Sequence, residues 1–317
     1  MPTLTLPKPH GFRLEAAAAF YASFTPGSGM AAAAAHTDGL TLAFHLDRTF
    51  EPTVVSIREE PRALVAEYAG SSDGTGVARQ IVRMLGLDAN GEAWLEVGRR
   101  DPVVGSLQST FSGFFTAAKA SPYDAATWAI IAPRMGMKAA ARLKIALAER
   151  AGDSVTFGGQ DHRLFPGPRA LERLSRFPGL PDEKLERLRG IARAALEGRL
   201  EAERLRAMPE RQALAQLMTL RGVGPWAASH ILFRGAAPPD ALPTVEPRVL
   251  HGFGAAYGIA TPTIEQLERA AEAWRPFRMW VCVLLSRHLA RSGAWHARGL
   301  GRERAAAGRR LVAKASA

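Results

Sequence analysis

The chain has 317 residues, 47% of them hydrophobic, which is enough to build two or three packed units. No apolar run reaches the roughly 20 residues that cross a bilayer, and no signal peptide is evident, so we expect a cytoplasmic protein without a membrane span. The single cysteine, Cys282, excludes an internal disulfide and a four-cysteine zinc or iron–sulfur site, and the net charge of +11 favours a polyanionic partner such as nucleic acid.

The first part of the chain, residues 1–115, has a mixed α and β pattern. Short strand-like segments over residues 41–46, 53–57 and 63–68 are separated by turn residues. Residues 76–85 carry apolar side chains at helical spacing, and this helix is expected to end near Gly86. The pattern predicts a small α+β domain.

From about Pro122 the pattern becomes helical. We expect helices over residues 123–131, 137–151, 182–196, 209–220, 225–233, 264–274 and 277–290. Several follow start signals, such as Ser121-Pro122, and the linkers are short and rich in Gly and Pro. Residues 116–290 are therefore predicted to form an all-helical core, and residues 291–317 a basic C-terminal tail.

A glycine hairpin is predicted at residues 218–226, between two of these helices. Gly222 and Gly224 flank Val223, and glycine lets the backbone take positive φ and lets a partner approach closely. Pro225 suits the first position of the next helix, whose free N–H groups attract phosphate. Such a turn holds a DNA backbone without reading its sequence. An ordinary joint between two helices is the alternative.

The residues around the hairpin resemble a known family. Residues 239–243 and Glu246 follow the hairpin, residues 79–88 and 121–141 precede it, and residues 271–285, with Trp274-Arg275-Pro276-Phe277-Arg278, come later. In this order they resemble the helix-hairpin-helix DNA glycosylases, closest to the 3-methyladenine DNA glycosylase II branch, over roughly residues 40–290. The resemblance implies an α+β domain followed by an all-α core of two helical subdomains, with the substrate cleft between them.

The activity that this resemblance implies is hydrolysis of the N-glycosidic bond of an alkylated or otherwise modified base, bulky bases included, that is flipped out of double-stranded DNA. The enzyme would be a nucleoid-associated monomer. Bifunctional relatives carry a lysine where this chain has Trp226, so we expect an abasic product and no AP-lyase step.

Glu246 occupies the position of the family's catalytic aspartate. A carboxylate there stabilises positive charge that develops on the deoxyribose, and orients or deprotonates water. The extra methylene of glutamate could displace the oxygens by about 1 Å, an error that can cost on the order of 100-fold in rate. The alternatives are a helix-capping Glu246 with catalysis lost, or Asp240 as the acid, although Asp240 fits a turn cap better.

The resemblance also implies positions that contact DNA and the base. Trp226 is the expected stacking wall for the flipped base, with a core tryptophan as the alternative. Arg134 stands in the loop that fills the gap left in the duplex, where it either inserts between bases or contacts phosphate. The predicted DNA-binding residues are Arg134, Arg221, Gly222, Val223 and Gly224.

Three further pocket positions depart from the aromatic residues common in this branch. They are His230, Pro247 and Ser286, and the smaller side chains predict a wider, more polar pocket for a base larger or more polar than 3-methyladenine. His230 could titrate near neutral pH and donate to the base, or serve as a structural histidine.

No cofactor is expected to be required. By the same resemblance, the backbone carbonyls of Met218, Leu220 and Val223 are candidates to hold a structural Na⁺ or K⁺ in the hairpin. An iron–sulfur cluster is not expected, because the chain has one cysteine.

Two other functions fit the same residues. One is a catalytically impaired protein that binds lesions or modified DNA on a glycosylase scaffold, which the replacement of Asp by Glu246 favours. The other is a generic helical DNA-binding or regulatory protein whose hairpin only grips phosphate, and it predicts no base pocket.

Overall fold

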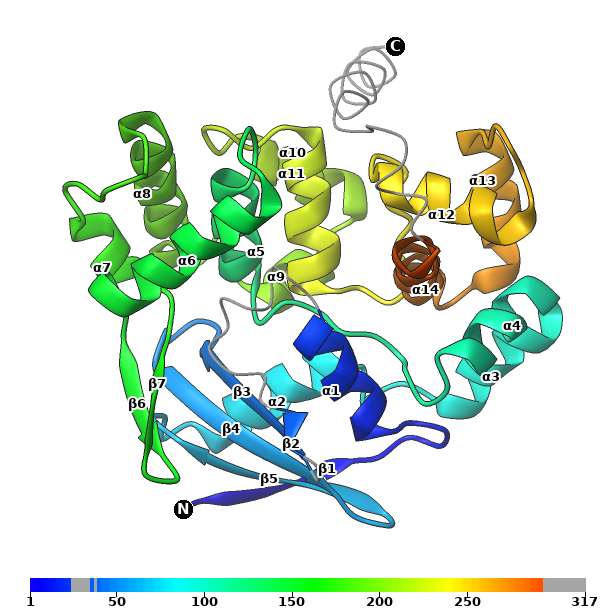
Figure 1. Ribbon diagram of the computed structural model, residues 1–317, viewed down its shortest axis with the longest axis horizontal. Coiled ribbons are helices and arrows are strands. Elements are labelled where there is room, and N and C mark those ends of the chain that lie inside the picture. Colours follow the sequence, from blue (N-terminus) through cyan, green and yellow to red (C-terminus); the bar gives the residue numbers. More distant parts are fainter. Residues whose placement is uncertain (24–34, 37–38, 293–317) are drawn as a thin grey trace.

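The computed structural model describes residues 1–23, 35–36 and 39–292. In Figure 1 an antiparallel sheet lies at the bottom, and most of the helices form the layer above it. The sheet has five strands in the order β1-β5-β4-β3-β2. Their bounds are β1 Thr3–Pro7, β2 Ala35–His36, β3 Gly39–His45, β4 Pro52–Glu59 and β5 Ala63–Ala69. The three strands predicted from the sequence are confirmed, and β1 and β2 are additions.

The helices of the first part of the chain are α1 Leu14–Ser23, α2 Gly74–Leu85, α3 Gly91–Arg100 and α4 Pro102–Thr110. Helices α1 and α2 pack on the sheet, whereas α3 and α4 lie to one side of it (Figure 1). Alternate residues of β3, Leu40, Leu42 and Phe44, share a core cluster with α1 and α2. The predicted end of α2 is confirmed, because Gly86 caps it with a left-handed φ of 70°.

The helical half of the molecule, residues 122–292, follows in chain order. Its elements are α5 Pro122–Ile131, α6 Met137–Ala151, α7 Pro168–Arg173, α8 Asp182–Leu196, α9 Ala202–Ala207, α10 Glu210–Met218, α11 Pro225–His230, the π-helical turn η2 Ile231–Ala236, α12 Pro247–Tyr257, α13 Ile264–Ala271, the 3₁₀ turn η3 Glu272–Trp274 and α14 Arg278–Arg291. The bounds predicted for α6 and α8 are confirmed. Helix α12 was not predicted, although Pro247 at its first position is a start signal.

The prediction of an all-helical core is wrong at one place. Residues 154–163 form a two-stranded hairpin of β6 Ser154–Phe157 and β7 Gln160–Arg163. Val155 and Leu164 pack on Ala43 and Val54, on the face of the sheet away from α1 and α2. The hairpin buries apolar side chains on that face of the sheet. This long-range packing is not visible in the local sequence pattern.

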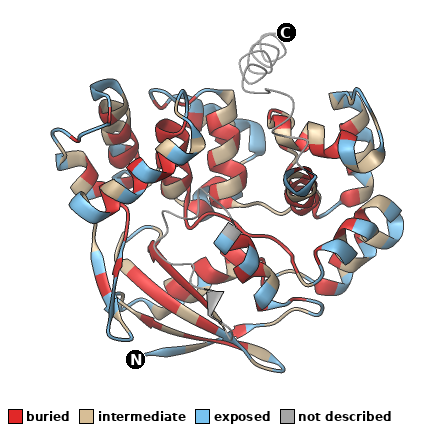
Figure 2. Cartoon of the chain, in the orientation of Figure 1, coloured by how far each residue is buried: buried red, intermediate tan, exposed pale blue. Residues whose placement is uncertain are grey.

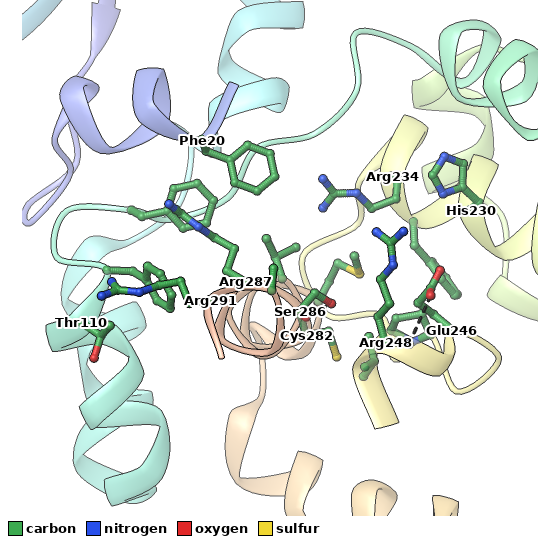
Figure 3. A pocket seen from close by; sticks show the side chains of 18 of the residues that line it. Phe20, Thr110, His230, Arg234, Glu246, Arg248, Cys282, Ser286, Arg287 and Arg291 are labelled. Carbon is green, nitrogen blue, oxygen red and sulfur yellow. Dashed lines mark hydrogen bonds between the residues drawn. The ribbon is translucent and has the colours of Figure 1, made fainter. Parts of the chain in front are cut away.

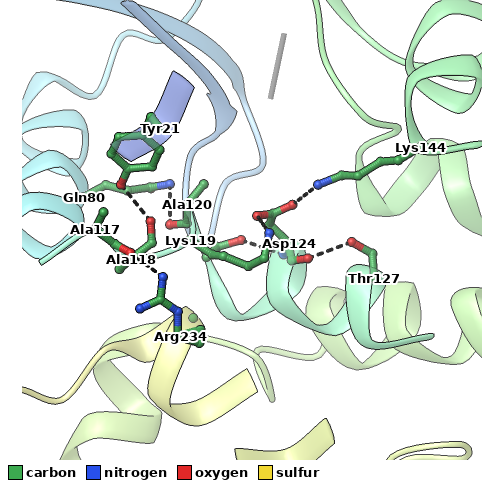
Figure 4. Close-up of polar contacts among 12 residues, drawn as sticks. Tyr21, Gln80, Ala117, Ala118, Lys119, Ala120, Asp124, Thr127, Lys144 and Arg234 are labelled. Carbon is green, nitrogen blue, oxygen red and sulfur yellow. Dashed lines mark hydrogen bonds and ion pairs between the residues drawn. The ribbon is translucent and has the colours of Figure 1, made fainter. Parts of the chain in front are cut away.

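The linker of residues 117–120 joins the sheet to the helical half, and its carbonyls are held by side chains from both (Figure 4). Tyr21 donates to the carbonyl of Ala118 at 2.7 Å, and Gln80 donates to that of Ala120 at 3.0 Å. Arg234, from η2, donates to the carbonyl of Ala117 at 2.7 Å. Because buried carbonyls are costly when unpaired, these bonds fix the linker against both halves.

A buried ionic cluster fixes the start of α5 beside this linker. Asp124 accepts from Lys119 at 3.1 Å and from Lys144 at 2.6 Å. Burial alone would raise the pKa of Asp124, but the two ammonium groups hold it well below its usual value. Burial lowers the pKa of Lys119 to about 8, although Asp124 opposes the shift. The cluster therefore locks α5 to α6 and to the linker.

The boundary at residue 116 and the two helical subdomains stay predictions. One cluster of buried apolar side chains extends through the sheet, α1 to α4 and the helical half, and Figure 2 shows buried segments in all of these parts. The predicted basic tail lies, from residue 293 on, outside the described residues. Within the described part of the chain, no helix combines the length and apolar character that a bilayer crossing requires.

Candidate active site

A cavity of about 670 Å³ lies among α1, the end of α4, the α11–η2 helix, α12 and α14 (Figure 3). Its size suits a small-molecule ligand. Of the residues predicted from the sequence, it brings together Trp226, His230, Glu246 and Ser286. Its remaining walls are mostly aromatic and apolar, but four arginines also line it: Arg234, Arg248, Arg287 and Arg291.

Glu246 is the residue before the first turn of α12, and both of its carboxylate oxygens accept hydrogen bonds. Oε1 accepts from the backbone N–H of Arg248 at 3.3 Å, and Oε2 accepts from Nε1 of Trp226 at 2.9 Å. A negative charge at a helix N-terminus is favourable. The added methylene of glutamate thus lets one carboxylate cap α12 and reach α11 as well.

Trp226 positions this carboxylate, a role that the sequence did not reveal. Its indole ring is half-buried and stacks on His230, one turn later in α11, with centroids 5.2 Å apart and planes 18° apart. The stacking covers part of the indole, while its N–H points to Glu246. A buried indole N–H needs an acceptor, and Glu246 is 20 residues away, so only the fold brings the two together. The role of Trp226 as a wall for a base stays a prediction.

The surroundings of His230 favour the second alternative, a structural histidine, over one that titrates near neutral pH. Burial lowers the pKa of His230 well below 6.5, and the positive charges of Lys119 and Arg234 add to the effect. Its Nε2 is buried without a hydrogen-bond partner among the described residues. His230 is thus a neutral ring in the wall of the cavity.

The cavity arginines were missed by the sequence analysis. Arg234 enters from the π-helical turn η2, and burial lowers its pKa to about 10, which leaves it charged at neutral pH. Arg287 and Arg291 lie one turn apart on α14, on the face that includes Val283. This helical spacing is a signal in the sequence, but Arg291 falls in the predicted tail, which begins at residue 291.

Two other predicted residues lie elsewhere. Pro247 is buried at the first position of α12 and does not line the cavity, so it does not widen it as expected. Asp240 forms ion pairs with Arg275 at 2.7 Å and Arg278 at 2.8 Å, and it is absent from the cavity wall. These pairs account for both arginines in the Trp274–Arg278 motif.

Ser286 lines the cavity as predicted, but it adds little polarity there. Its hydroxyl donates to the carbonyl of Cys282, one turn earlier in α14, at 2.9 Å. The hydroxyl hydrogen of Ser286 is therefore used in a hydrogen bond within α14 and is not available to a ligand in the cavity.

The predicted hairpin forms between α10 and α11, outside the cavity wall. Gly222 has φ of 87°, and a Cβ there would lie 2.6 Å from Cδ of Arg187 on α8. Gly224 has an ordinary φ of −92°, but a Cβ there would meet nothing within 4 Å. The buried side chain of Val223 anchors the turn in the core, whereas Arg221 and Gly224 are exposed.

The loop after α5 carries Arg134, which is exposed and has a left-handed φ of 59°. Lys184, on α8, donates to the carbonyls of Ile131 at 2.6 Å and Pro133 at 2.7 Å in this loop. Arg187, which contacts the hairpin at Gly222, is one turn further along α8. Both predicted DNA-contacting loops therefore rest on the same helix.

The three carbonyls predicted for a monovalent cation lie in or next to the hairpin turn. The carbonyl of Leu220 accepts from the N–H of Val223 at 3.0 Å and keeps a second lone pair. Met218 is 43% exposed, so its end of α10 is open to solvent. The cation at these carbonyls stays a prediction. Among the described residues, no group of three His, Cys, Asp or Glu side chains is arranged to hold a metal.

Comparison with known proteins agrees with this fold. No family model matches the chain. A protein of Bacillus subtilis (strain 168) named DNA-3-methyladenine glycosylase is 25% identical over 219 residues, covering 67% of this chain and 72% of that protein. The structure of a 3-methyladenine DNA-glycosylase from Archaeoglobus fulgidus has a TM-score of 0.71 at 20% identity, covering 92% of this chain and 98% of the other.

A second solved structure has the same fold. It is the Clostridium acetobutylicum 8-oxoguanine glycosylase/lyase in complex with double-stranded DNA, with a TM-score of 0.57 at 15% identity over 82% of this chain and 97% of the other. Together these matches confirm the resemblance to the helix-hairpin-helix DNA glycosylases, and the chain has their fold.

Proposed function

We propose that this protein is a monofunctional DNA glycosylase that hydrolyses the N-glycosidic bond of a modified base flipped out of double-stranded DNA. The observation that carries the proposal is the carboxylate of Glu246, held at both oxygens on the wall of a cavity of about 670 Å³. The similarity to a relative named DNA-3-methyladenine glycosylase supports the class of reaction.

In the proposed reaction the bond between the base nitrogen and C1′ breaks, and the bonding electrons leave with the base. Glu246 stabilises the positive charge that develops on the sugar. A water oxygen then bonds to C1′, and its proton passes through the carboxylate to solvent or to the departing base. The charged side chains of Arg234 and Arg248, which line the same cavity, would stabilise negative charge on the leaving base.

The cavity wall also fits the absence of a lyase step. A lyase needs an amine that attacks C1′ to form a Schiff base. No lysine is among the described residues that line the cavity, and Lys119 behind it is paired with Asp124. We therefore propose that the product is an abasic site in an uncut strand.

The surface that would hold the DNA is proposed from the two loops on α8. The open turn at Gly224 admits a phosphate, Arg221 beside it is exposed, and the strained Arg134 stands in the loop proposed to fill the duplex. A Na⁺ or K⁺ on the carbonyls of Met218, Leu220 and Val223 would add positive charge to that turn.

The test is a profile of bases released from variously modified duplexes under single-turnover conditions. The wild type should release a base and leave a site that breaks only after alkali. Glu246→Gln keeps the size of the side chain but loses the charge and one of the two acceptor oxygens, so the rate should fall about 100-fold or more. Glu268→Gln, exposed on α13, is the matched control and should not change the rate.

One observation favours a second candidate, a protein that binds modified DNA without releasing a base. Both oxygens of Glu246 already accept hydrogen bonds, as in a structural helix cap. Specific binding of modified duplex with no base released, in the wild type and in Glu246→Gln alike, would favour this candidate over the enzyme.

A further inference from the structure

The two ends of the cavity differ in whether a carboxylate lies among their arginines: Glu246 lies with Arg234 and Arg248 at one end, and the described residues at the other end include none. In Figure 3, Glu246 and His230 lie at one end, while Arg287 and Arg291 lie at the other, beside Phe20 and the end of α4. A base whose sugar bond lies at Glu246 would project its far edge toward the arginine end. The chemical group that the arginine end binds therefore determines which modified base fits the cavity.

Arg287 is held in place without being neutralised. Its guanidinium lies over three rings, 5.2 Å from the centroid of Phe20, 4.6 Å from Phe111 and 4.4 Å from Phe114. Arg291 lies 5.7 Å from the centroid of Phe111. Aromatic faces attract a guanidinium and fix its plane, but they carry no net charge that cancels it.

Among the described residues that line the cavity, none at the arginine end is a carboxylate. Among the described residues, no carboxylate lies within ion-pair distance of Arg287 or Arg291, and Nη1 of Arg287 is buried without an acceptor. Burial lowers the pKa of Arg287 to about 10, so it stays charged at neutral pH. A buried charged N–H without a partner is costly, and an anionic ligand would relieve that cost.

A DNA phosphate is a weaker explanation for these arginines. The loops that fit the DNA backbone, at Arg134 and Gly224, are not part of the cavity wall, whereas Arg287 is inside it, against rings of α1 and residues 111–114. The cavity also places four arginines against one carboxylate, which disfavours a cationic alkylated purine.

We propose that the Arg287 end of the cavity binds an acidic substituent, a carboxylate or a group of similar charge, on the flipped base. This inference rests on the proposed function and narrows its substrate class. A planar guanidinium pairs with a carboxylate through two parallel hydrogen bonds, and the surrounding phenyl rings exclude water from the pair. A cavity of about 670 Å³ has room for a base with such a side group.

The experiment uses matched duplexes that differ by one charge. One pair carries adenine with a carboxymethyl or a carbamoylmethyl group on its exocyclic amine, and a second pair carries uracil with the same groups at C5. Base release is measured in single turnover, and binding is measured with Glu246→Gln. The acidic member of at least one pair should be released, and bound, about 10-fold or more better than its amide.

Three variants locate the effect. Arg287→Gln should abolish the preference by slowing release of the acidic base about 10-fold more than release of the amide base, and Arg287→Lys, which keeps the charge, should retain part of the preference. Arg150→Gln, exposed at the end of α6, is the control and should keep the full preference. Circular dichroism checks that each variant is folded.

Equal release of acidic and amide bases, with activity on either, would overturn the inference and leave the proposed function standing. If Arg287→Gln and Arg287→Lys slow release of the acidic base and of the amide base equally, Arg287 contributes only packing to the cavity wall. That result would also overturn the inference. If no duplex loses a base, the proposed function fails, and the binding comparison decides the inference alone: no preference for the acid refutes it.

Discussion

The contact between Glu246 and Trp226 explains a departure that looked damaging in the sequence. A glutamate in place of aspartate suggested a misplaced carboxylate, but the longer side chain accepts from Trp226 and from the first turn of α12 together. Two donors from two helices fix a flexible side chain, which is what a preorganised site requires. By the family resemblance, the same tryptophan stands at the position where a lyase would have its lysine.

His230 gives a pH-dependent prediction. Its pKa is well below 6.5 in the folded protein, because of burial and then of nearby positive charge, whereas an unfolded histidine titrates near 6.5. Below pH 6.5 the unfolded state therefore binds more protons, and the free energy of unfolding falls as pH falls, by up to about 1.4 kcal/mol per pH unit. Above pH 6.5 the full stability is present.

His230→Phe keeps a ring stacked on Trp226 and removes the titrating group, so its free energy of unfolding should fall less than that of the wild type between pH 6.5 and 5.5. Urea unfolding at pH 7.5, 6.5 and 5.5 measures the difference. The same slope in both proteins would mean that His230 is readily protonated in the folded state.

At the residue scale the sequence was informative where the family resemblance assigns a position. The resemblance placed Glu246, Trp226 and His230 in one site, and the structure brings them together. It did not place Arg287, because the rings that hold this guanidinium come from segments far away in the chain. The pKa of His230 was missed for a similar reason, since burial depends on packing and not on spacing.

At the element scale, α8 supports both loops proposed to contact DNA. Lys184 holds the loop of Arg134, and Arg187 packs under Gly222. The helix was predicted with its observed bounds, from its apolar spacing. Its role as a common support was not predictable, because hydrogen bonds from Lys184 to carbonyls some 50 residues away depend on the tertiary fold.

The two hairpin glycines should differ in what they do. Gly222→Ala places a Cβ at φ 87° and 2.6 Å from Arg187, so it should lower the free energy of unfolding by about 1 kcal/mol or more. Gly224→Ala meets open space at an ordinary φ, so its stability should stay within about 0.5 kcal/mol of the wild type.

If a DNA backbone approaches Gly224 closely, the added methyl of Gly224→Ala should weaken binding about 10-fold. Urea unfolding and fluorescence anisotropy with a labelled duplex separate the two effects. Unchanged DNA affinity in Gly224→Ala would show that the duplex does not approach this side of the turn.

At the scale of the whole molecule, one continuous core of buried side chains joins the units that the sequence predicts. The β6–β7 hairpin, from the part predicted to be helical, covers the N-terminal sheet, and Asp101, before α4, accepts from Trp274 at 2.9 Å and from Tyr257 in the last third of the chain. Contacts over such separations leave no local pattern, which is why the sequence showed the elements and missed how they join.

Arg83 on α2 tests this continuity. It is buried, and its guanidinium donates to the carbonyls of Ala120 in the linker and Gly235 in η2, with the carboxylate of Asp47 at 3.9 Å. Arg83→Met removes a cation that joins the sheet, the linker and the cavity wall. Because it leaves buried acceptors and a carboxylate without that partner, it should cost about 3–5 kcal/mol.

Arg79→Met, one turn earlier on α2, is the matched control. Arg79 is exposed and pairs with Glu203 at 3.1 Å, so its loss should cost less than about 1 kcal/mol. Urea unfolding followed by tryptophan fluorescence and far-ultraviolet circular dichroism should give coincident transitions in all three proteins, with a lower midpoint in Arg83→Met only. If the sheet and the helical half were independent domains, the transitions would separate, and Arg83→Met would shift one of them and leave the other in place.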